Sequence, residues 1–167
     1  MITASHNPYY DNGIKIVSSY GEKLDDGTAS LIEAYLDGDL ERLGLRTADL
    51  PLASRDRIGC IVDYVAGRNR YVGYLISLAS HSYKDMRIGL DCANGAAWMI
   101  AKSVFDALGA RTTVIGASPN GLNVNEGCGS THIETLQELV RSGHLDVGFA
   151  FDGDADRCIA VDENGAV

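Results

Sequence analysis

Three aspartates at alternate positions, Asp152, Asp154 and Asp156, most constrain what this 167-residue chain can fold into. They follow the apolar run at residues 147–151 and precede a second apolar run at residues 158–161. Two such runs around a polar turn are typical of buried strands joined by a tight connection. Neighbouring carboxylates repel one another by about 1 kcal/mol per pair in water, and by more when partly buried. The pattern therefore favours a bound cation over a solvated acidic turn.

The ligand atoms restrict the kind of cation, because carboxylate oxygens suit a hard divalent ion, Mg²⁺ or Ca²⁺. An EF-hand loop would add Glu163 as its last ligand, but it requires glycine where this chain has Arg157, and its flanks are helices. We therefore reject an EF-hand. A haloacid-dehalogenase-type aspartyl nucleophile also follows a strand with an Asp-x-Asp pattern. That alternative leaves the third aspartate and the arginine unexplained.

Arg157 places a cationic side chain directly after the three aspartates. It can simply neutralise them. Its planar guanidinium can also bind a phosphate through two parallel hydrogen bonds. A metal ion and an arginine at one turn suggest a phosphoryl group held between them.

Composition limits the class of partner. The net charge of −9, from 14 basic and 23 acidic residues, argues against a nucleic acid or an anionic membrane. No apolar run approaches membrane-spanning length, and the first residues do not form a signal peptide. The four cysteines show no C-x-x-C spacing, so we expect reduced, mostly buried thiols in a cytoplasmic protein. They are Cys60, Cys92, Cys128 and Cys158.

The chain opens with a polar loop, because Pro8 disfavours helix at Asn7. Residues 11–13 predict a turn, and residues 14–17 predict a short strand. Ser5 beside His6 could be an activated hydroxyl, but the side chains of adjacent residues diverge and rarely form a nucleophile–base pair. From local chemistry alone, we therefore interpret both residues as part of a polar loop. A polar loop this early is expected to pack against a preceding segment. We therefore expect the chain to be truncated at its start, and also at its end.

Two α/β domains are predicted, at residues 1–57 and 58–167. The first combines the remnant of one domain, with a helix at residues 26–40, and a linker at residues 44–57. In the second, Asp63 is predicted to cap a helix with a buried apolar face formed by Tyr64, Tyr71, Leu75 and Leu78. The next predicted elements are a strand at 86–92, a helix at 97–108 ended by Gly109, a strand at 112–115, a helix from 133 ended by Gly143, and a strand at 147–151. This alternation indicates βαβ units and a mixed, mainly parallel sheet with flanking helices.

The glycine-rich segment at residues 127–132 opens a predicted helix. Such a segment can hold a phosphate, but this one lacks the Walker lysine, and a capping box of Thr131 and Glu134 explains it equally well. In open parallel sheets, ligands gather at the carboxyl ends of the strands. The acidic turn and the turn at residues 91–95 are both predicted at such ends.

Two motifs together carry a resemblance to a known family. Residues 3–8 (Thr-Ala-Ser-His-Asn-Pro) resemble the phosphoserine loop of the α-D-phosphohexomutases, and residues 152–157 resemble their metal-binding loop. Four further segments resemble the phosphoglucosamine mutase branch: residues 10–15, 91–96, 121–125 and 128–132. The resemblance covers essentially the whole chain and corresponds to the end of the first and most of the second of four family domains. One departure is Ala155, where glycine is commoner in the family.

The resemblance implies a role for each matching residue. Ser5 would carry the phosphoryl group, give it to the sugar and later recover it. Asp152, Asp154 and Asp156 would bind Mg²⁺ together with a phosphoserine oxygen, which also makes Ser5 a metal ligand.

Four further residues take supporting roles in the same resemblance. Arg157 would contact the phosphoserine. His6 and Lys15 are candidates for proton transfer or charge stabilisation, and Asn7 would shape the loop.

The implied activity of the intact enzyme interconverts glucosamine 6-phosphate and glucosamine 1-phosphate through a bisphosphate, in amino-sugar biosynthesis. Phosphomannomutase or phosphoglucomutase activity, or a non-catalytic metal-binding fragment, remain alternatives. We expect negligible turnover by these residues alone. Exposed strand edges and apolar surface in the first domain would favour pairing between copies of the chain.

Overall fold

The computed structural model describes residues 1–46 and 53–167. The chain divides into two compact units: the first contains Met1 and Lys15–Asp63, and the second contains Ile2–Ile14 and Tyr64–Val167. The predicted domain boundary between residues 57 and 58 stays a prediction. Within the expected linker at residues 44–57, residues 47–52 lie outside the described part. None of the helices in the described ranges is long and apolar enough to cross a lipid bilayer.

The first unit contains the helix α1 (Asp26–Leu36) and the short 3-10 helix η3 (Arg55–Arg57). Asp25 caps α1, because its carboxylate accepts a hydrogen bond from the backbone N–H of Thr28 at 2.9 Å. The helix ends four residues before the predicted Leu40. Gly38 has a positive φ of 78°, which breaks the helical repeat.

The second unit is built on a mixed sheet of four strands in the order β4-β3-β5-β6. The strands are β3 (Arg87–Asp91), β4 (Arg111–Ile115), β5 (Val147–Phe151) and β6 (Cys158–Asp162). β3 pairs in parallel with both β4 and β5, whereas β6 returns antiparallel to β5. The predicted α/β class with a mixed, mainly parallel sheet is therefore confirmed.

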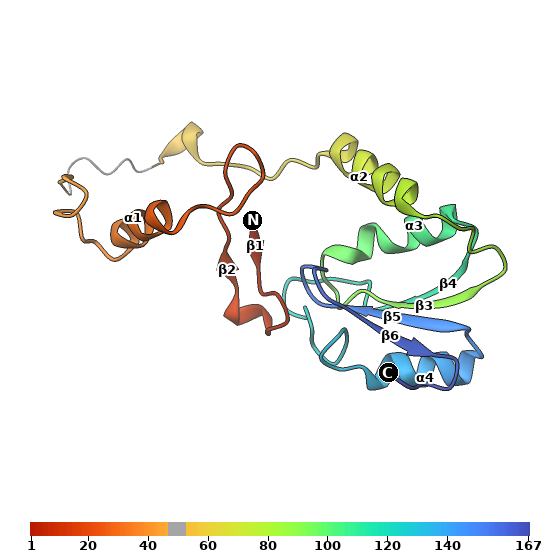
Figure 1. The fold of residues 1–167 in the computed structure, drawn as a ribbon. Coiled ribbons are helices and arrows are strands. Elements are labelled where there is room, and N and C mark those ends of the chain that lie inside the picture. Colours follow the sequence, from red (N-terminus) through yellow and green to blue (C-terminus); the bar gives the residue numbers. More distant parts are fainter. Residues whose placement is uncertain (47–52) are drawn as a thin grey trace. The chain divides into compact units, whose positions relative to one another are not determined.

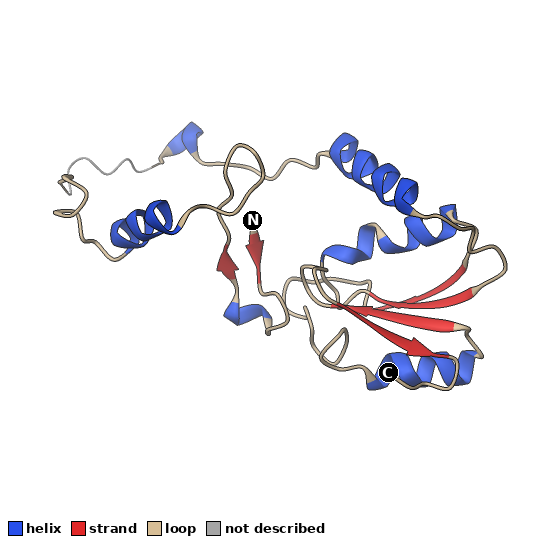
Figure 2. Ribbon diagram, in the orientation of Figure 1, coloured by secondary structure: helices blue, strands red, loops and turns tan. Residues whose placement is uncertain are grey.

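Helices cover both faces of this sheet, as Figures 1 and 2 show. They are α2 (Val65–Leu78), the short η4 (Ala96–Met99), α3 (Ala101–Ala107) and α4 (Glu134–Gly143). α2 and α3 lie on one side, and α4 lies on the other. The second unit also holds a small antiparallel pair, β1 (Ile2–Thr3) with β2 (Gly13–Ile14), joined through η1 (Tyr9–Asp11).

The core consists of one buried cluster on each face of the sheet. Alternate residues of a strand point to opposite faces, so Ile88 and Leu90 of β3 share one side. They pack with Cys92, Ala97, Ala101 and Ala110. The cluster beneath α4 contains Leu136, Val140, Leu145, Ala150 and Val161. Leu136 and Val140, on the inner face of α4, are fully buried.

Two predicted helix caps are wrong. The N-cap of α2 is Tyr64 rather than Asp63, and no side chain caps it. The capping box of Thr131 and Glu134 is absent because α4 starts from Ile133, which is already helical and has no side-chain cap. At the other end of α4, Gly143 remains inside the helix and His144 adopts the left-handed conformation that ends it, with φ of 49°.

Three predictions about length or burial also need correction. α2 has no buried residue: Tyr71 is 50% exposed and Leu78 is 61% exposed, so its predicted apolar face is not a core face. The helix predicted at residues 97–108 is interrupted at Ile100, where η4 gives way to α3. The strand predicted at residues 14–17 is reduced to the end of β2, and Val17 forms only an isolated bridge with Lys23.

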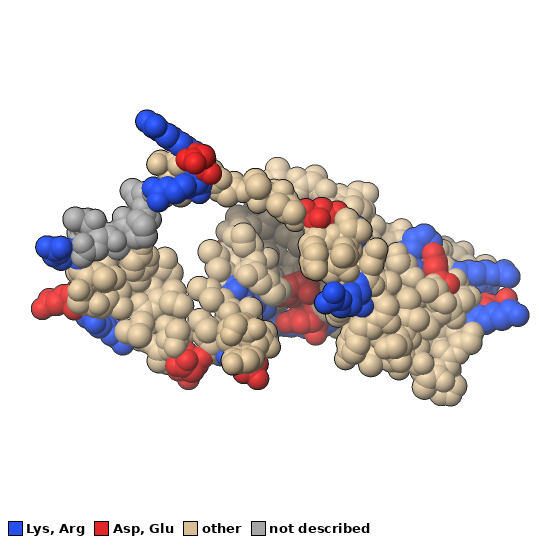
Figure 3. All heavy atoms as spheres, turned by 90° about the horizontal axis from the view of Figure 1, so that it is seen from above, with Lys and Arg blue, Asp and Glu red and all other residues tan. Residues whose placement is uncertain are grey.

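Charged side chains on the second unit pair locally. Arg87 contacts Asp146 at 2.9 Å, and Lys102 contacts Asp106 at 2.7 Å. The hydrogen bond from Arg87 holds the pKa of the Asp146 carboxyl below its ordinary value. On the face seen in Figure 3, basic and acidic side chains are interspersed. Such exposed pairs each contribute about 0.2–1 kcal/mol and do not determine the fold.

A pair of glycines lets α4 lie directly on the sheet. Gly89 of β3 is paired with Gly148 of β5. A methyl group at Gly148 would lie 2.7 Å from Cγ2 of Val140 and 3.0 Å from Cδ1 of Leu136. Since both neighbours are fully buried, they have little room to move.

We expect Gly148→Ala to lower the free energy of unfolding by about 1–3 kcal/mol, because the added methyl overfills the core beneath α4. Urea denaturation followed by circular dichroism measures this change. Gly73→Ala in α2 is the matched control: its methyl would meet no atom within 4 Å, and alanine in a helix is favoured by about 0.5–1 kcal/mol. A Gly148→Ala protein as stable as the parent would contradict the close packing.

The four cysteines divide into two environments. Cys60 and Cys158 are exposed, whereas Cys92 and Cys128 are buried, so the prediction of mostly buried thiols holds for only two of them. Burial, with a smaller effect of the nearby Asp91 carboxylate, raises the pKa of Cys92 to about 12 and that of Cys128 to about 11. Both thiols are therefore protonated and unreactive at neutral pH.

Titration of the native chain with a thiol reagent at pH 8 is expected to label two cysteines, and to label all four after denaturation. Cys60→Ser should reduce the native count from two to one, whereas Cys92→Ser should leave it at two. Rapid labelling of four thiols in the folded chain would show that the Cys92 and Cys128 environments are open.

Candidate functional site

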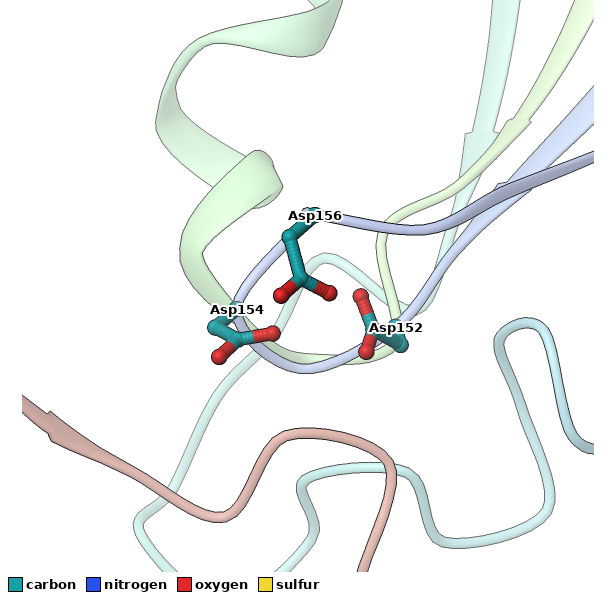
Figure 4. A group of neighbouring side chains, drawn as sticks. All are labelled: Asp152, Asp154 and Asp156. Atoms are coloured by element: carbon teal, nitrogen blue, oxygen red, sulfur yellow. The ribbon is translucent and has the colours of Figure 1, made fainter. Parts of the chain in front are cut away.

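The acidic loop, residues 152–157, connects the antiparallel strands β5 and β6 after their last pair, Phe151 and Cys158. Asp152 is completely buried, Asp154 is half-buried and Asp156 is exposed. One oxygen atom from each carboxylate lies within 4.8 Å of the others. Figure 4 shows the three carboxylates pointing toward a common space within the loop. The three aspartates therefore form one group, and their predicted role as metal ligands stays a prediction.

Backbone hydrogen bonds shape the acidic loop. The N–H of Ala155 donates to the carbonyl of Asp152 at 3.1 Å, and the N–H of Arg157 donates to Oδ1 of Asp152 at 3.3 Å. Ala155 has a φ of 60°, in the left-handed region. In this region a residue with a side chain is less stable than glycine by about 1 kcal/mol. The backbone conformation therefore explains why glycine is commoner in the family at the position of Ala155.

The Ser5 loop, residues 3–8, meets the acidic loop through three hydrogen bonds. The N–H of Gly153 donates to the carbonyl of Ser5 at 2.9 Å. Oγ1 of Thr3 donates to Oδ2 of Asp154 at 2.9 Å, and Oγ of Ser5 lies 3.4 Å from Oδ2 of Asp152. Both loops belong to the second unit. The serine predicted near the start of the chain and the carboxylates near its end therefore share one site.

Ser5 is held in an unfavourable backbone conformation, with a φ of 52°. Its N–H donates to Oγ1 of Thr3 at 2.8 Å, which closes a short turn. Nδ1 of His6 lies 3.5 Å from Oγ of Ser5, too far for a strong hydrogen bond but close enough to tighten with a small movement. Non-glycine residues in this region cost about 1–3 kcal/mol and persist where the surroundings fix them.

Gly153 permits the two loops to approach. A methyl group at this position would lie 2.5 Å from the carbonyl oxygen of Ser5 and 2.8 Å from Cγ2 of Val124. Any side chain here would push the Ser5 loop away from the acidic loop. The glycine is thus required by a contact with residues far away in the sequence.

The turn after β3 lies beside this site and has a different use. Asp91 is fully buried, and its carboxylate accepts hydrogen bonds from the N–H groups of Ala93 at 3.0 Å and Gly129 at 2.7 Å. Burial raises the pKa of Asp91, and those two hydrogen bonds oppose the rise. The next N–H, of Ser130, donates to the carbonyl of Phe151 at 2.9 Å. Amides of the glycine-rich segment therefore bind protein oxygens, and this segment ties β3 to β5.

The other predicted site residues stand as follows. The side chain of Arg157 is 57% exposed and its Nε lies 4.0 Å from Oδ1 of Asp156, so it is placed beside the acidic group. Lys15 belongs to the first unit, and its role stays a prediction. The carbonyl of Asn7 accepts a hydrogen bond from Asn125 at 2.8 Å.

Sequence reasoning missed two residues that join the loops. Thr3 stands inside the recognised motif, but no role was predicted for it, although its hydroxyl binds Asp154. Asn125 is separated from Ser5 by 120 residues, and no local pattern announces their contact. The only signal was its place in the polar segment at residues 121–125.

The residues present suit a divalent cation. Three carboxylates with ligand atoms within 4.8 Å of one another, one of them fully buried, repel strongly unless a cation lies between them. All the candidate ligands are oxygen atoms, including the hydroxyl of Ser5 at the edge of the group. Such a set fits a hard cation better than zinc or copper.

Comparisons with known proteins identify the family to which the chain is similar. The family model for phosphoglucomutase/phosphomannomutase, alpha/beta/alpha domain II, matches residues 69–165, and the model for alpha/beta/alpha domain I matches residues 1–42. Phosphoglucosamine mutase of Lachnospira eligens is 62% identical over 167 residues, which is all of this chain and 36% of that protein. The phosphoglucosamine mutase of Lachnoclostridium phytofermentans is 54% identical over the same span.

A solved structure has the same fold. The crystal structure of a phosphoglucomutase/phosphomannomutase family protein from Burkholderia thailandensis matches with a TM-score of 0.66 and 25% identity, over 98% of this chain and 33% of that one. This chain spans about a third of the length of the curated relatives it matches, with 36% of each of the two named above. With more than half of its residues matched by the domain II model, the chain belongs to the phosphoglucomutase/phosphomannomutase family.

Proposed function

We propose that this chain supplies the phosphoserine and metal-binding parts of a phosphoglucosamine mutase, which interconverts glucosamine 6-phosphate and glucosamine 1-phosphate through a bisphosphate. The observation that carries the proposal is the position of Ser5, whose Oγ lies 3.4 Å from the buried Asp152 of the acidic loop. The relatives with 62% and 54% identity over the whole chain are phosphoglucosamine mutases, which supports the glucosamine phosphates as substrates.

Phosphoryl transfer depends on positioning and charge neutralisation more than on new covalent chemistry. In the proposed reaction, a hydroxyl oxygen of the sugar phosphate forms a bond to the phosphorus carried by Ser5, and the bond from that phosphorus to Oγ breaks. The proton of the sugar hydroxyl passes to a base. In the return step, Oγ of Ser5 forms a bond to the phosphorus of the other phosphoryl group, the bond from that phosphorus to the sugar oxygen breaks, and the base returns the proton to that sugar oxygen. The hydrogen bonds on the carbonyl of Ser5 hold its Oγ beside Asp152.

The residues around Ser5 can manage the charge and the proton. Asp152, Asp154 and Asp156 would hold Mg²⁺, which when bound neutralises negative charge on phosphoryl oxygens. His6, with Nδ1 at 3.5 Å from Oγ, is suited to hold or move a proton at that oxygen. Arg157 and Lys15 would offset the remaining negative charge of three carboxylates and one dication.

A metal-binding chain without turnover is the second candidate function. It is favoured by the coverage of the relatives, because the chain spans 36% of their length. By this reading the 167 residues alone bind Mg²⁺ and fail to interconvert glucosamine phosphates. Phosphomannomutase and phosphoglucomutase activities remain the alternatives within the family, and association between copies of the chain stays a prediction.

We expect Asp154→Ala to weaken Mg²⁺ binding to the 167-residue chain at least tenfold, because it removes one of three adjacent carboxylate ligands. Isothermal titration calorimetry with Mg²⁺ measures this directly. Glu163→Gln is the matched control, since it removes an equal charge from an exposed turn outside the acidic loop. An equal loss of Mg²⁺ affinity in both variants would indicate attraction to the overall negative charge rather than binding at a defined site.

The transfer chemistry can be tested in a chimera in which this chain replaces the matching 36% of the Lachnospira eligens relative. We expect conversion of glucosamine 1-phosphate by the chimera, loss of that activity in Ser5→Ala, and one phosphoryl group on Ser5 by intact-mass measurement. Ser18→Ala, which changes a serine in the first unit, serves as the control. Activity that survives Ser5→Ala would exclude Ser5 as the phosphoryl carrier.

A further inference from the structure

We propose that Asn125 is a positioning residue that fixes the Ser5 loop so that Oγ of Ser5 faces Asp152. The inference rests on the proposed function only in taking Ser5 as the phosphoryl carrier. Asn125 lies outside the acidic loop and outside the Ser5 loop. It acts through the backbone of the Ser5 loop and not on the reacting atoms.

The contacts of the Asn125 amide are directed at both ends of the Ser5–Asn7 turn. Its Nδ2 donates to the carbonyl of Ser5 at 2.8 Å and to the carbonyl of Asn7 at 2.8 Å. Two donors on one planar NH₂ group set the distance between the two carbonyls, and so fix the turn that carries Ser5. Both hydrogens belong to one rigid planar group, so a rotation of the amide that changes one hydrogen bond also changes the other.

The burial of the Asn125 side chain shows which of its polar atoms are used. Asn125 is only 5% exposed, and its Oδ1 accepts no hydrogen bond from the described residues. A buried polar atom left in this state costs about 1–3 kcal/mol. The amide is therefore placed for the two donors of its NH₂ group and not for its oxygen.

The backbone of Asn125 is itself held firmly. Its N–H donates to the carbonyl of Ala93 at 2.9 Å, in the turn that follows β3. Its φ of 58° lies in the left-handed region, which asparagine tolerates better than most residues. The side chain thus projects from a fixed point at the carboxyl end of the sheet.

Two donors converge on the carbonyl of Ser5, Nδ2 of Asn125 and the N–H of Gly153. Together they fix the orientation of the peptide plane between Ser5 and His6. Without the Asn125 amide, the N–H of Gly153 alone would hold this carbonyl. Ser5 could then relax from its φ of 52° and carry Oγ away from Asp152.

Two variants separate the role of the donors from a loss of folding. Asn125→Asp keeps the shape and the backbone preference but replaces the NH₂ donors by an oxygen. Asn125→Gly keeps the left-handed backbone and removes the side chain without burying a charge. Asn123→Asp is the matched control, because the Asn123 amide bonds within its own loop, to the carbonyl of Ser118 and the N–H of Asn120.

The first measurement is amide hydrogen exchange in the 167-residue chain. We expect the N–H of Gly153 to exchange at least about tenfold faster in both Asn125 variants, with the N–H of Leu90 unchanged and with parental rates in Asn123→Asp. The second measurement is mutase kinetics in the chimera. We expect kcat to fall about 10- to 100-fold with KM for the sugar phosphate unchanged, since misplacing a reacting group by 1 Å can cost about 10²-fold.

Parental exchange at Gly153 in both variants would overturn the proposal, and so would parental kcat. A fall in melting temperature with unchanged kcat would also overturn it, because it would assign Asn125 a purely structural role. If the parent chimera has no mutase activity, the proposed function fails, while the exchange rates still decide whether Asn125 fixes the Ser5 loop.

Discussion

The carbonyl oxygen of Ser5 is the point on which the site depends. It accepts hydrogen bonds from Gly153 of the acidic loop and from Asn125 of a loop in between, and these bonds join segments more than a hundred residues apart. Backbone carbonyls are strong acceptors, and buried ones need partners. The serine is consequently placed by its main chain, which leaves its hydroxyl available for chemistry beside Asp152.

The sheet brings these segments together at the carboxyl ends of its parallel strands. β3 and β5 run in parallel, so the turn containing Asp91 and the acidic loop leave the sheet at the same end. β6 then returns antiparallel to β5, which closes the acidic loop into a hairpin. The glycine-rich segment spans the two strands through Asp91 and Phe151. The parallel pairing of β3 and β5 thus determines where the site lies, and the β5–β6 hairpin places the three carboxylates close together.

Electrostatics supports the proposed cation at the acidic loop. Asp91 is buried with two N–H donors on its carboxylate, and these donors oppose the rise in its pKa that burial causes. Asp152 is equally buried but lies next to two more carboxylates. Asp152 also accepts hydrogen bonds from the N–H of Arg157 and from Oγ of Ser5, so it is the neighbouring carboxylates that favour a cation beside it. Two buried aspartates at neighbouring strand ends therefore have different surroundings: Asp91 binds backbone N–H groups, and Asp152 belongs to the group that we propose as the cation site.

The sequence by itself determined the α/β class and the strand–loop–strand frame around the three aspartates, because these follow from local apolar runs and their alternation with helical segments. It misplaced the caps at Asp63 and Thr131, since the tertiary context fixed where α2 and α4 begin. Only the tertiary structure decided that Thr3 and Asn125 bind the two loops together, and that Gly153 has to be glycine. These contacts join residues far apart in the chain, and no local pattern encodes which distant atoms folding will bring within hydrogen-bond distance.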